Sequence, residues 1–211
     1  MKLIIFDCDS TLTSLEGIDE LARLKGEKIF KEIEDLTNDA MDGKVPIDEI
    51  FGRRLHIIQP DRTACEQVAQ LILETVEPTA KDTMVALRAK GWTPIILSGG
   101  LTQVIEPLAK YLGIDEIQAV DLIFDAQGAY SSFDTSAPPT RNGGKPEIVA
   151  QLRKKYHPER IIMVGDGISD LETKPVVDQF IGFTRYVARS KVTQEADLCI
   201  SALAELIESL D

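Results

Sequence analysis

The fold is decided by one stretch near the start of the chain, Ile4-Ile5-Phe6-Asp7-Cys8-Asp9-Ser10-Thr11-Leu12-Thr13. A short apolar strand ends here in two carboxylates, and Ser10 and Thr11 mark a turn. Alternate side chains of a strand share a face, so Asp7 and Asp9 lie on one side if the extended geometry continues for one more residue. Two carboxylates held together repel unless they share a proton or bind a cation, and Mg²⁺ prefers carboxylate oxygens. The plainer alternative is that Asp9 or Ser10 caps a helix and Asp7 is a solvated strand end.

Composition narrows the class of protein. The chain has 211 residues, enough for one core with an inserted subdomain, and 44% of them are hydrophobic. Its net charge of −12 disfavours nucleic acid and anionic membranes as partners, because both require a basic face. The apolar run at the N-terminus is too short for a secretory signal, and no stretch approaches a membrane span. Against this global charge, an anionic substrate would need a site made locally positive by a metal ion and a few Lys and Arg side chains.

The cysteines and histidines are interpreted as structural. The cysteines number three and lie far apart without a CxxC pair, which indicates a reducing compartment and predicts a cytoplasmic protein. The neighbouring carboxylates oppose thiolate formation at Cys8, so we expect a small filler residue there and not a nucleophile. His56 and His157 sit in charged helical surroundings, and neither is assigned to catalysis.

Helical and strand patterns divide the chain into two parts. A charged block of about four short helices runs from about residue 15 to 76, with apolar residues at helical spacing. Strands and helices alternate regularly only after this block, which marks it as an insertion. The expected strands are 92–97, 114–120, 160–164, 179–183 and 198–200, the expected helices are 79–90, 101–112, 145–156 and one at the C-terminus, and a β-hairpin is expected over 122–133.

The expected fold class is α/β. Buried strands separated by helices predict a Rossmann-like parallel sheet with helices on both faces, to which the chain adds an inserted helical cap and a small β-hairpin. The predicted domains are a core of residues 1–14 and 77–211 and a cap of residues 15–76. Functional sites in such sheets lie beyond the carboxyl ends of the strands.

Polar clusters follow the strands at that edge. Taken singly, a Ser-Gly-Gly is an ordinary turn and a lysine at a helix start is a surface residue, although here the lysine opposes the helix dipole. At a strand-to-helix turn, backbone N–H groups beside glycines can also approach an anion at the helix N-terminus. Stability alone gives no reason to collect four aspartates at one edge of a sheet. The clusters are Asp7 with Asp9, Ser98-Gly99-Gly100, Gly143-Gly144-Lys145, and Gly165-Asp166-Gly167-Ile168-Ser169-Asp170.

In their order, these motifs resemble those of the haloacid dehalogenase superfamily. More narrowly, the chain resembles the phosphoserine phosphatase family over nearly its whole length. The resemblance implies a Mg²⁺-dependent hydrolase that dephosphorylates L-phosphoserine to L-serine. The stretches that carry the narrower resemblance are 16–22, Ala40-Met41, Arg54-Leu55, Ile58-Gln59-Pro60, Phe133-Asp134 and Phe180-Ile181-Gly182-Phe183.

The resemblance also implies roles for the residues of the core. Asp7 would attack phosphorus to form an aspartyl-phosphate, and Asp9 would protonate the leaving alkoxide and then deprotonate water. Mg²⁺ would bind carboxylate oxygens of Asp7 and Asp166 and the backbone carbonyl of Asp9. Around them, Ser98, Gly99, Gly100 and Lys145 would hold the phosphoryl group, with Thr11 and Asp170 in support.

Cap residues would read the amino acid part of the substrate. By the same resemblance, Glu16 pairs with an ammonium, Arg54 forks onto a carboxylate and Met41 closes over the substrate. The plainer interpretations are a helix-start acid, a solvated arginine and a core methionine. Asp42 departs from the family's pattern, in which a small or otherwise variable residue commonly follows the methionine. An extra acid near an anionic substrate weakens binding unless it faces solvent.

Other functions stay open at this point. The same chemistry fits another small phosphomonoester, or phosphotransfer to an acceptor alcohol. A receiver-like signalling module also uses an aspartate, acidic metal ligands, a Ser or Thr and a Lys, but its phosphoacceptor lies mid-chain and it lacks a helical insertion. The predicted partner is a small-molecule phosphomonoester, with neither nucleic acid nor membrane, and the sequence leaves a homodimer open.

Overall fold

A central parallel sheet organises the protein, whose computed structural model describes residues 1–42 and 44–210. The strands lie in the order β3-β2-β1-β6-β7-β8, and every neighbouring pair is parallel. Helices cover both faces, so the predicted α/β fold class is confirmed. The strands are β1 (Lys2–Phe6), β2 (Trp92–Leu101), β3 (Glu116–Val120), β6 (Arg160–Gly165), β7 (Gln179–Phe183) and β8 (Leu198–Ile200).

Alternation along β1 explains why both faces of the sheet are apolar. Leu3 and Ile5 pack against one layer of helices, and Ile4 and Phe6 pack against the other. The first layer contains α7 (Gly144–Tyr156), α8 (Ile168–Leu171) and α9 (Ser190–Glu195); the second contains α5 (Ala80–Ala89), α6 (Thr102–Leu112) and α10 (Leu206–Ser209).

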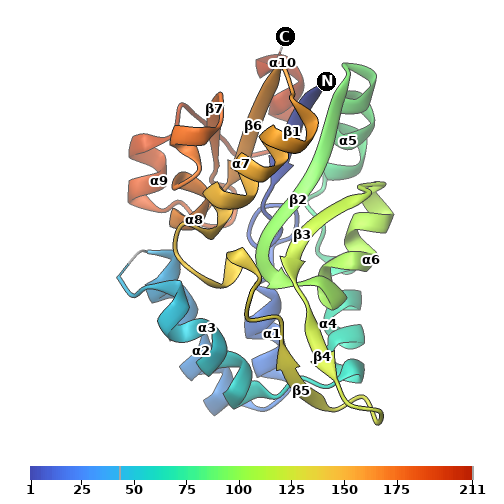
Figure 1. The fold of residues 1–211 in the computed structure, drawn as a ribbon, viewed down its shortest axis with the longest axis vertical. Coiled ribbons are helices and arrows are strands. Elements are labelled where there is room, and N and C mark those ends of the chain that lie inside the picture. Colours follow the sequence, from blue (N-terminus) through green and yellow to red (C-terminus); the bar gives the residue numbers. More distant parts are fainter. Residues whose placement is uncertain (43, 211) are drawn as a thin grey trace.

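The segment between β1 and α5 forms a separate group of helices. Figure 1 shows them, with the hairpin, at the end of the molecule opposite to the two termini. The chain leaves and re-enters the core at one place. The Ser14 N–H donates to the Thr75 carbonyl (3.1 Å), and Thr13 forms an isolated antiparallel β-bridge with Val76. The helices are α1 (Gly17–Arg23), α2 (Glu27–Met41), α3 (Ile47–Ile58) and α4 (Arg62–Glu74).

The predicted hairpin is present and packs on the inserted helices. Its strands, β4 (Leu122–Phe124) and β5 (Tyr130–Phe133), pair in the antiparallel sense. Phe133 packs against Phe51 of α3 with the rings tilted by 57° and their centroids 5.3 Å apart, and the Arg62 N–H donates to the Gly128 carbonyl (2.9 Å). The hairpin therefore extends the core toward the insertion.

Two parts of the secondary structure differ from the expectation. β2 does not stop at Leu97 but continues to Leu101 through a register shift against β3, so α6 begins only at Thr102. The short helices α8 and α9 were not predicted, because four to six residues carry too little periodicity to stand out in a sequence.

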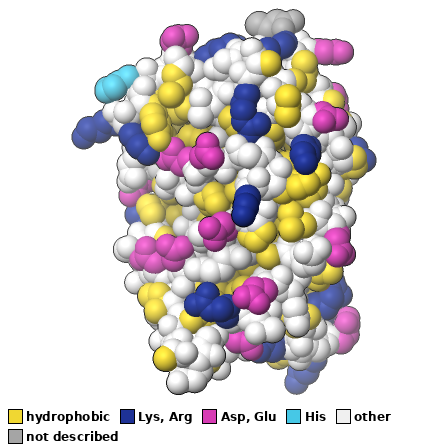
Figure 2. All heavy atoms as spheres, turned by 90° about the vertical axis from the view of Figure 1, so that its right-hand side faces the viewer, with side chains coloured by type: hydrophobic (Ala, Val, Ile, Leu, Met, Phe, Trp, Pro, Cys, Tyr) yellow, Lys and Arg dark blue, Asp and Glu magenta, His cyan; other side chains and the backbone are white. Residues whose placement is uncertain are grey.

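The surface bears mixed charge. On the face in Figure 2, acidic and basic side chains are interspersed with small apolar patches, and basic groups do not gather into an extended positive area. Within residues 1–42 and 44–210, no helix combines the length and apolar character needed to cross a membrane. The cysteines Cys8, Cys65 and Cys199 are all free.

Candidate active site

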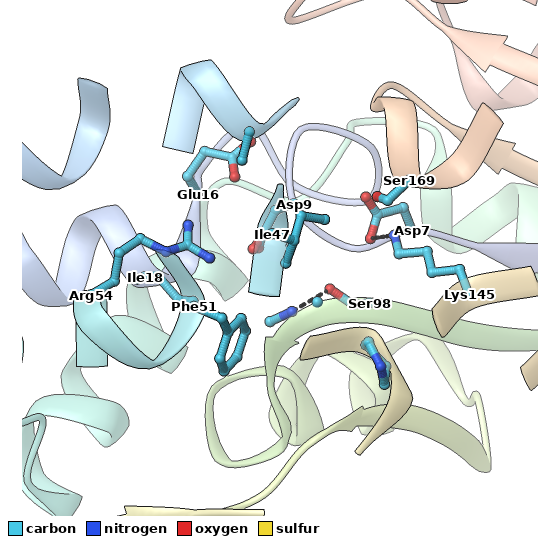
Figure 3. Close-up of a pocket in the computed structure, with 14 residues that line it drawn as sticks. Asp7, Asp9, Glu16, Ile18, Ile47, Phe51, Arg54, Ser98, Lys145 and Ser169 are labelled. Atoms are coloured by element: carbon cyan, nitrogen blue, oxygen red, sulfur yellow. Dashed lines mark hydrogen bonds and ion pairs between the residues drawn. The ribbon is translucent and has the colours of Figure 1, made fainter. Parts of the chain in front are cut away.

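Adjacent strands bring several of the predicted site residues to one edge of the sheet, beside a cavity; Asp166, Asp170 and Thr11 are not among the residues that line it. β1 lies between β2 and β6, so Asp7 after β1, Ser98 on β2 and Asp166 after β6 meet at one edge of the sheet. Figure 3 shows residues of the core facing residues of the inserted helices across this cavity. Its lining residues are Asp7, Asp9, Glu16, Ile18, Ala40, Ile47, Phe51, Arg54, Ser98, Gly99, Gly100, Pro139, Lys145 and Ser169.

Lys145 lies between two buried carboxylates. Its Nζ is 3.0 Å from Asp7 Oδ1 and 2.6 Å from Asp170 Oδ1. Burial opposes the lysine's charge, but Asp170 and Asp7 outweigh it and raise the pKa of Lys145. The Cys8 N–H also donates to Asp7 Oδ1 (2.8 Å). One oxygen of Asp7 is thus held by two donors, while Oδ2 has no hydrogen-bond partner in the described part of the chain.

Glycines allow this close packing. A Cβ on Gly165 would lie 2.3 Å from Asp170 Cγ, and one on Gly144 would lie 1.7 Å from the Pro138 carbonyl oxygen. Only glycine therefore lets the end of β6 approach Asp170 and lets α7 begin where Lys145 enters the site.

The acidic cluster fits a divalent cation. Asp7, Asp166 and Asp170 each offer a carboxylate oxygen, and these atoms lie within 4.8 Å of one another. Burial, followed by the charges of Glu16 and Asp7, raises the pKa of Asp166 to about 8. An all-oxygen set of buried, mutually repelling carboxylates is the kind of site that Mg²⁺ binds. The cluster includes Asp170, which the sequence predicted only as a supporting residue. The expected metal contact of the Asp9 backbone carbonyl stays a prediction.

Two further carboxyls at the cavity favour their protonated forms. Burial and the charge of Asp7 raise the pKa of Asp9 to about 8, and burial and the charge of Asp9 do the same for Glu16. Ser10 adopts a left-handed conformation (φ 50°), and its hydroxyl donates to Glu16 Oε1 (2.6 Å), which opposes the shift. A cation bound beside Asp7 would lower these pKa values.

The Ser-Gly-Gly segment lies inside the cavity without starting a helix. The Gly100 N–H donates to Ser98 Oγ (2.9 Å), and Ser98, Gly99 and Gly100 all line the cavity. Because β2 runs through these residues, they face the cavity from a strand and not from the helix N-terminus expected from the sequence.

The cap residues divide into three cases. Glu16 and Arg54 line the cavity, as expected. The side chain of Met41 lies outside the part of the chain that the structure describes, so its expected role stays a prediction. The Asp42 carboxylate accepts from Arg189 Nη1 (2.9 Å) and pairs with Lys44 Nζ (3.1 Å), so two cations compensate its charge.

Some contacts of the site were not predicted. Arg189 donates through Nε to Asp166 (3.3 Å) and through Nη1 to Asp42, and so joins the acidic cluster to the insertion. Arg54 Nη1 donates to the Thr37 hydroxyl (2.9 Å), which donates to Asp19 (2.5 Å). Asp19 and Arg54 stood in stretches that carry the family resemblance, but no sequence signal pointed to Thr37 or Arg189.

Thr11 is buried but makes no contact that explains a supporting role. Its Oγ1 has no hydrogen-bond partner among the described residues. Its expected contribution therefore stays a prediction.

Comparison with known proteins identifies the class. The family of haloacid dehalogenase-like hydrolases matches residues 1–173. Phosphoserine phosphatase of Homo sapiens is 36% identical over 213 residues, which cover 99% of this chain and 92% of that protein. The chain belongs to the haloacid dehalogenase-like hydrolases, and within them to the phosphoserine phosphatase family.

Solved structures agree with this classification. A phosphoserine phosphohydrolase-like protein from Francisella tularensis subsp. tularensis SCHU S4 superposes with a TM-score of 0.91 at 27% identity, covering 100% of both chains. A phospho-aspartyl intermediate analogue of phosphoserine phosphatase superposes with a TM-score of 0.88 at 27% identity, covering 99% of this chain and 98% of the other. The resemblance expected from the motifs is therefore confirmed.

Proposed function

We propose that this protein hydrolyses L-phosphoserine to L-serine and phosphate, through a phosphate ester formed on Asp7. One observation carries the proposal: the cavity has Asp7 and Lys145 on its core side, and Glu16 and Arg54 on its cap side. The first pair suits a phosphoryl group, and the second suits an ammonium and a carboxylate. The human relative named above is a phosphoserine phosphatase, which supports the same substrate.

Asp7 is the nucleophile in this proposal. Lys145 and the Cys8 N–H hold its Oδ1, so the free Oδ2 attacks phosphorus. A bond forms between Asp7 Oδ2 and phosphorus, and the bond from phosphorus to the serine oxygen breaks. Lys145 neutralises charge on the phosphoryl oxygens, while Ser98 positions them. The description of one solved relative as a phospho-aspartyl intermediate analogue supports this step.

Asp9 moves the proton. Burial and the charge of Asp7 raise the pKa of Asp9, which favours its protonated form, and in this proposal that form gives its proton to the departing serine oxygen. The carboxylate left behind then takes a proton from water, whose oxygen attacks phosphorus and releases Asp7. The enzyme returns to its starting state.

Mg²⁺ fits the acidic cluster and is proposed as the cofactor. Asp7 and Asp166 would hold it through carboxylate oxygens, with Asp170 beside them. When bound, it offsets the repulsion between these carboxylates and the substrate phosphate. Arg189 and Lys145 supply the remaining positive charge from the chain itself.

Residues 15–76 are proposed to act as a cap over the cavity, and the remainder as the catalytic core. The insertion joins the core through the paired segments at Ser14 and Thr75. The ion pair between Asp42 and Arg189 fastens the far end of α2 to the core. Closing such a cap excludes water and completes the substrate contacts. A cytoplasmic location remains a prediction, which the free cysteines support.

The test is phosphate release from L-phosphoserine, with Mg²⁺ and with EDTA, beside a panel of small phosphomonoesters. We expect metal-dependent turnover with a clear preference for phosphoserine. Asp7→Asn should lower turnover by at least about 1,000-fold. Activity on the panel but not on phosphoserine would keep the chemistry and overturn the substrate. Formation of a new phosphoester with an added alcohol, in place of phosphate release, would favour phosphotransfer.

A further inference from the structure

Arg54 is a buried cation without a carboxylate partner. It is 4% exposed, and no carboxylate in residues 1–42 and 44–210 forms an ion pair with it. Burial lowers the pKa of Arg54, while the charges of Asp19, Glu16 and Asp9 act in the opposite direction. An unpaired buried charge is unfavourable, so this arrangement is suited to receiving an anion.

The hydrogen bonds of Arg54 leave one edge of the guanidinium free. Within the described residues, its one hydrogen bond is from Nη1 to Thr37 Oγ1 (2.9 Å). Its Nε is buried and has no partner there. In Figure 3 the guanidinium points from α3 toward the middle of the cavity. An arginine can bind a carboxylate by two parallel hydrogen bonds from such an edge.

Thr37 lies between this cation and an acid. Its hydroxyl donates to Asp19 Oδ1 (2.5 Å) and accepts from Arg54 Nη1. Because a guanidinium can only donate, the single hydroxyl proton points to Asp19 and the direction of both hydrogen bonds is fixed. Thr37 is 2% exposed and Asp19 is 5% exposed. The three residues come from α2, α1 and α3 respectively, and thus link three helices of the insertion.

We propose that Thr37 and Asp19 are positioning residues, which hold Arg54 so that its Nε edge binds the carboxylate of the substrate. A direct ion pair between Asp19 and Arg54 would occupy the guanidinium. The interposed hydroxyl keeps the acid close enough to stabilise the cation, yet leaves Nε to the substrate. Preference for a phosphomonoester that bears a carboxylate therefore depends on Thr37. The inference rests on the proposed function, because it assumes that a substrate carboxylate enters the cavity.

The alternative is that the three residues only hold the helices together. Kinetics on two substrates separate these roles. L-Phosphoserine and phosphoethanolamine share the phosphate and the ammonium, but phosphoethanolamine lacks the carboxylate. A positioning role affects the first substrate alone, whereas loosening of the insertion affects both.

The experiment measures kcat and KM for both substrates in Thr37→Val, which keeps the shape and removes the hydroxyl. We expect KM for L-phosphoserine to rise about tenfold, since a hydrogen bond to a charged group is lost. Its kcat and both constants for phosphoethanolamine should stay within about twofold of the parent. Thr37→Ser, which keeps the hydroxyl, should restore the parent KM. The matched control is Thr83→Val, the same change at a buried position of α5 in the core.

A second variant covers the case in which Thr37→Val does not fold. Asp19→Asn keeps an acceptor for Thr37 but removes the charge, and should raise KM for L-phosphoserine alone by about threefold. Equal effects on both substrates, or no effect in either variant while the parent prefers L-phosphoserine, would overturn the inference alone. A parent enzyme that does not distinguish the two substrates would overturn the proposed function along with it.

Discussion

The protonation of single residues at and beside the cavity is governed by the excess of buried carboxylates over cations. Burial raises the pKa of Asp9, Glu16 and Asp166 to about 8 each. Such carboxyls are costly to ionise without a counter-charge, which is why a cation and a proton donor are both expected here. Asp19, in α1 of the insertion, is a further buried acid whose pKa is raised.

Asp19 should make stability depend on pH. Burial raises its pKa from 3.8 to about 6, although the Thr37 hydroxyl and Arg54 oppose the shift. Between these values the folded chain keeps a proton that the unfolded chain has lost, so stability falls as pH rises through this range and is constant above it. Asp19→Asn removes this loss. The free energy of unfolding of Asp19→Asn minus that of the parent should therefore be roughly 2 kcal/mol higher at about pH 7.5 than at about pH 4.

Urea unfolding of Asp19→Asn and the parent at the two pH values checks this expectation. The comparison uses the difference between the two proteins, so titration of other groups cancels. A difference that is the same at both pH values would contradict the pKa assigned to Asp19.

Much of the site could be predicted because its residues stand next to strong local signals. Asp7 and Asp166 end apolar strands, and Ser98 and Lys145 accompany glycines. Thr37 and Arg189 carry no such signal. Arg189 becomes a partner of Asp42, 147 residues away in the chain, only when the insertion folds back on the core.

At the scale of helices and strands, long apolar runs were predicted well and short elements were not. β7 and β8 have the bounds expected from their sequences. The end of β2 was placed too early, because Ser98-Gly99-Gly100 has the composition of a turn, whereas the register shift lets the strand continue. Sheet pairing outweighs local preference in such a case.

The packing of β6 against α8 predicts opposite effects for two glycine substitutions. Gly165→Ala would put a Cβ 2.3 Å from Asp170 Cγ, whereas a Cβ on Gly52 in α3 would make ordinary contact with the Phe133 ring at 3.5 Å. We expect Gly165→Ala to destabilise the protein by at least about 2 kcal/mol. Gly52→Ala should stabilise it by about 0.5–1 kcal/mol through helix propensity. Urea unfolding measures both, and a Gly165→Ala protein as stable as the parent would contradict the packing at Asp170.

The ion pair between α2 and the core predicts a change in cap mobility. Asp42→Asn removes the partner of Arg189 and should weaken this contact by about 1 kcal/mol, because the Asp42 side chain is 37% exposed and the pair is partly screened by solvent. Amides near the end of α2 should then exchange hydrogen about fivefold faster. The matched control is Asp39→Asn, since Asp39 pairs with Lys44 and not with the core. Equal exchange in the two variants would show that the Asp42–Arg189 contact does not hold the cap.

At the scale of the whole molecule, a chain of net charge −12 would bind an anionic substrate only where Lys145, Arg54 and a bound cation offset the buried carboxylates of the cavity. The cavity lies between a sheet edge and an inserted group of helices, and the proposed function gives its two sides separate tasks. This division follows from topology, because the sheet edge is shared by the superfamily motifs while the insertion supplies Glu16 and Arg54.

Binding of Mg²⁺ should stabilise the whole fold. A ligand present at about 100 times its Kd adds about 2.7 kcal/mol, which raises the Tm of a chain of this size by roughly 5–10 °C. Asp166→Asn should abolish the rise, and Asp48→Asn, at an exposed position of α3, should retain it. Thermal unfolding with Mg²⁺ and with EDTA measures the effect. An undiminished rise in Asp166→Asn would place the cation elsewhere.

The central claim is that one cavity combines phosphoryl chemistry with recognition of an amino acid. The most direct test is the ratio of kcat/KM for L-phosphoserine to kcat/KM for phosphoethanolamine, measured in the parent enzyme with Mg²⁺. We predict a ratio of roughly 100, as expected when a buried arginine loses its carboxylate partner. A ratio near one would mean that Arg54 does not read the substrate, and would contradict the assignment of L-phosphoserine.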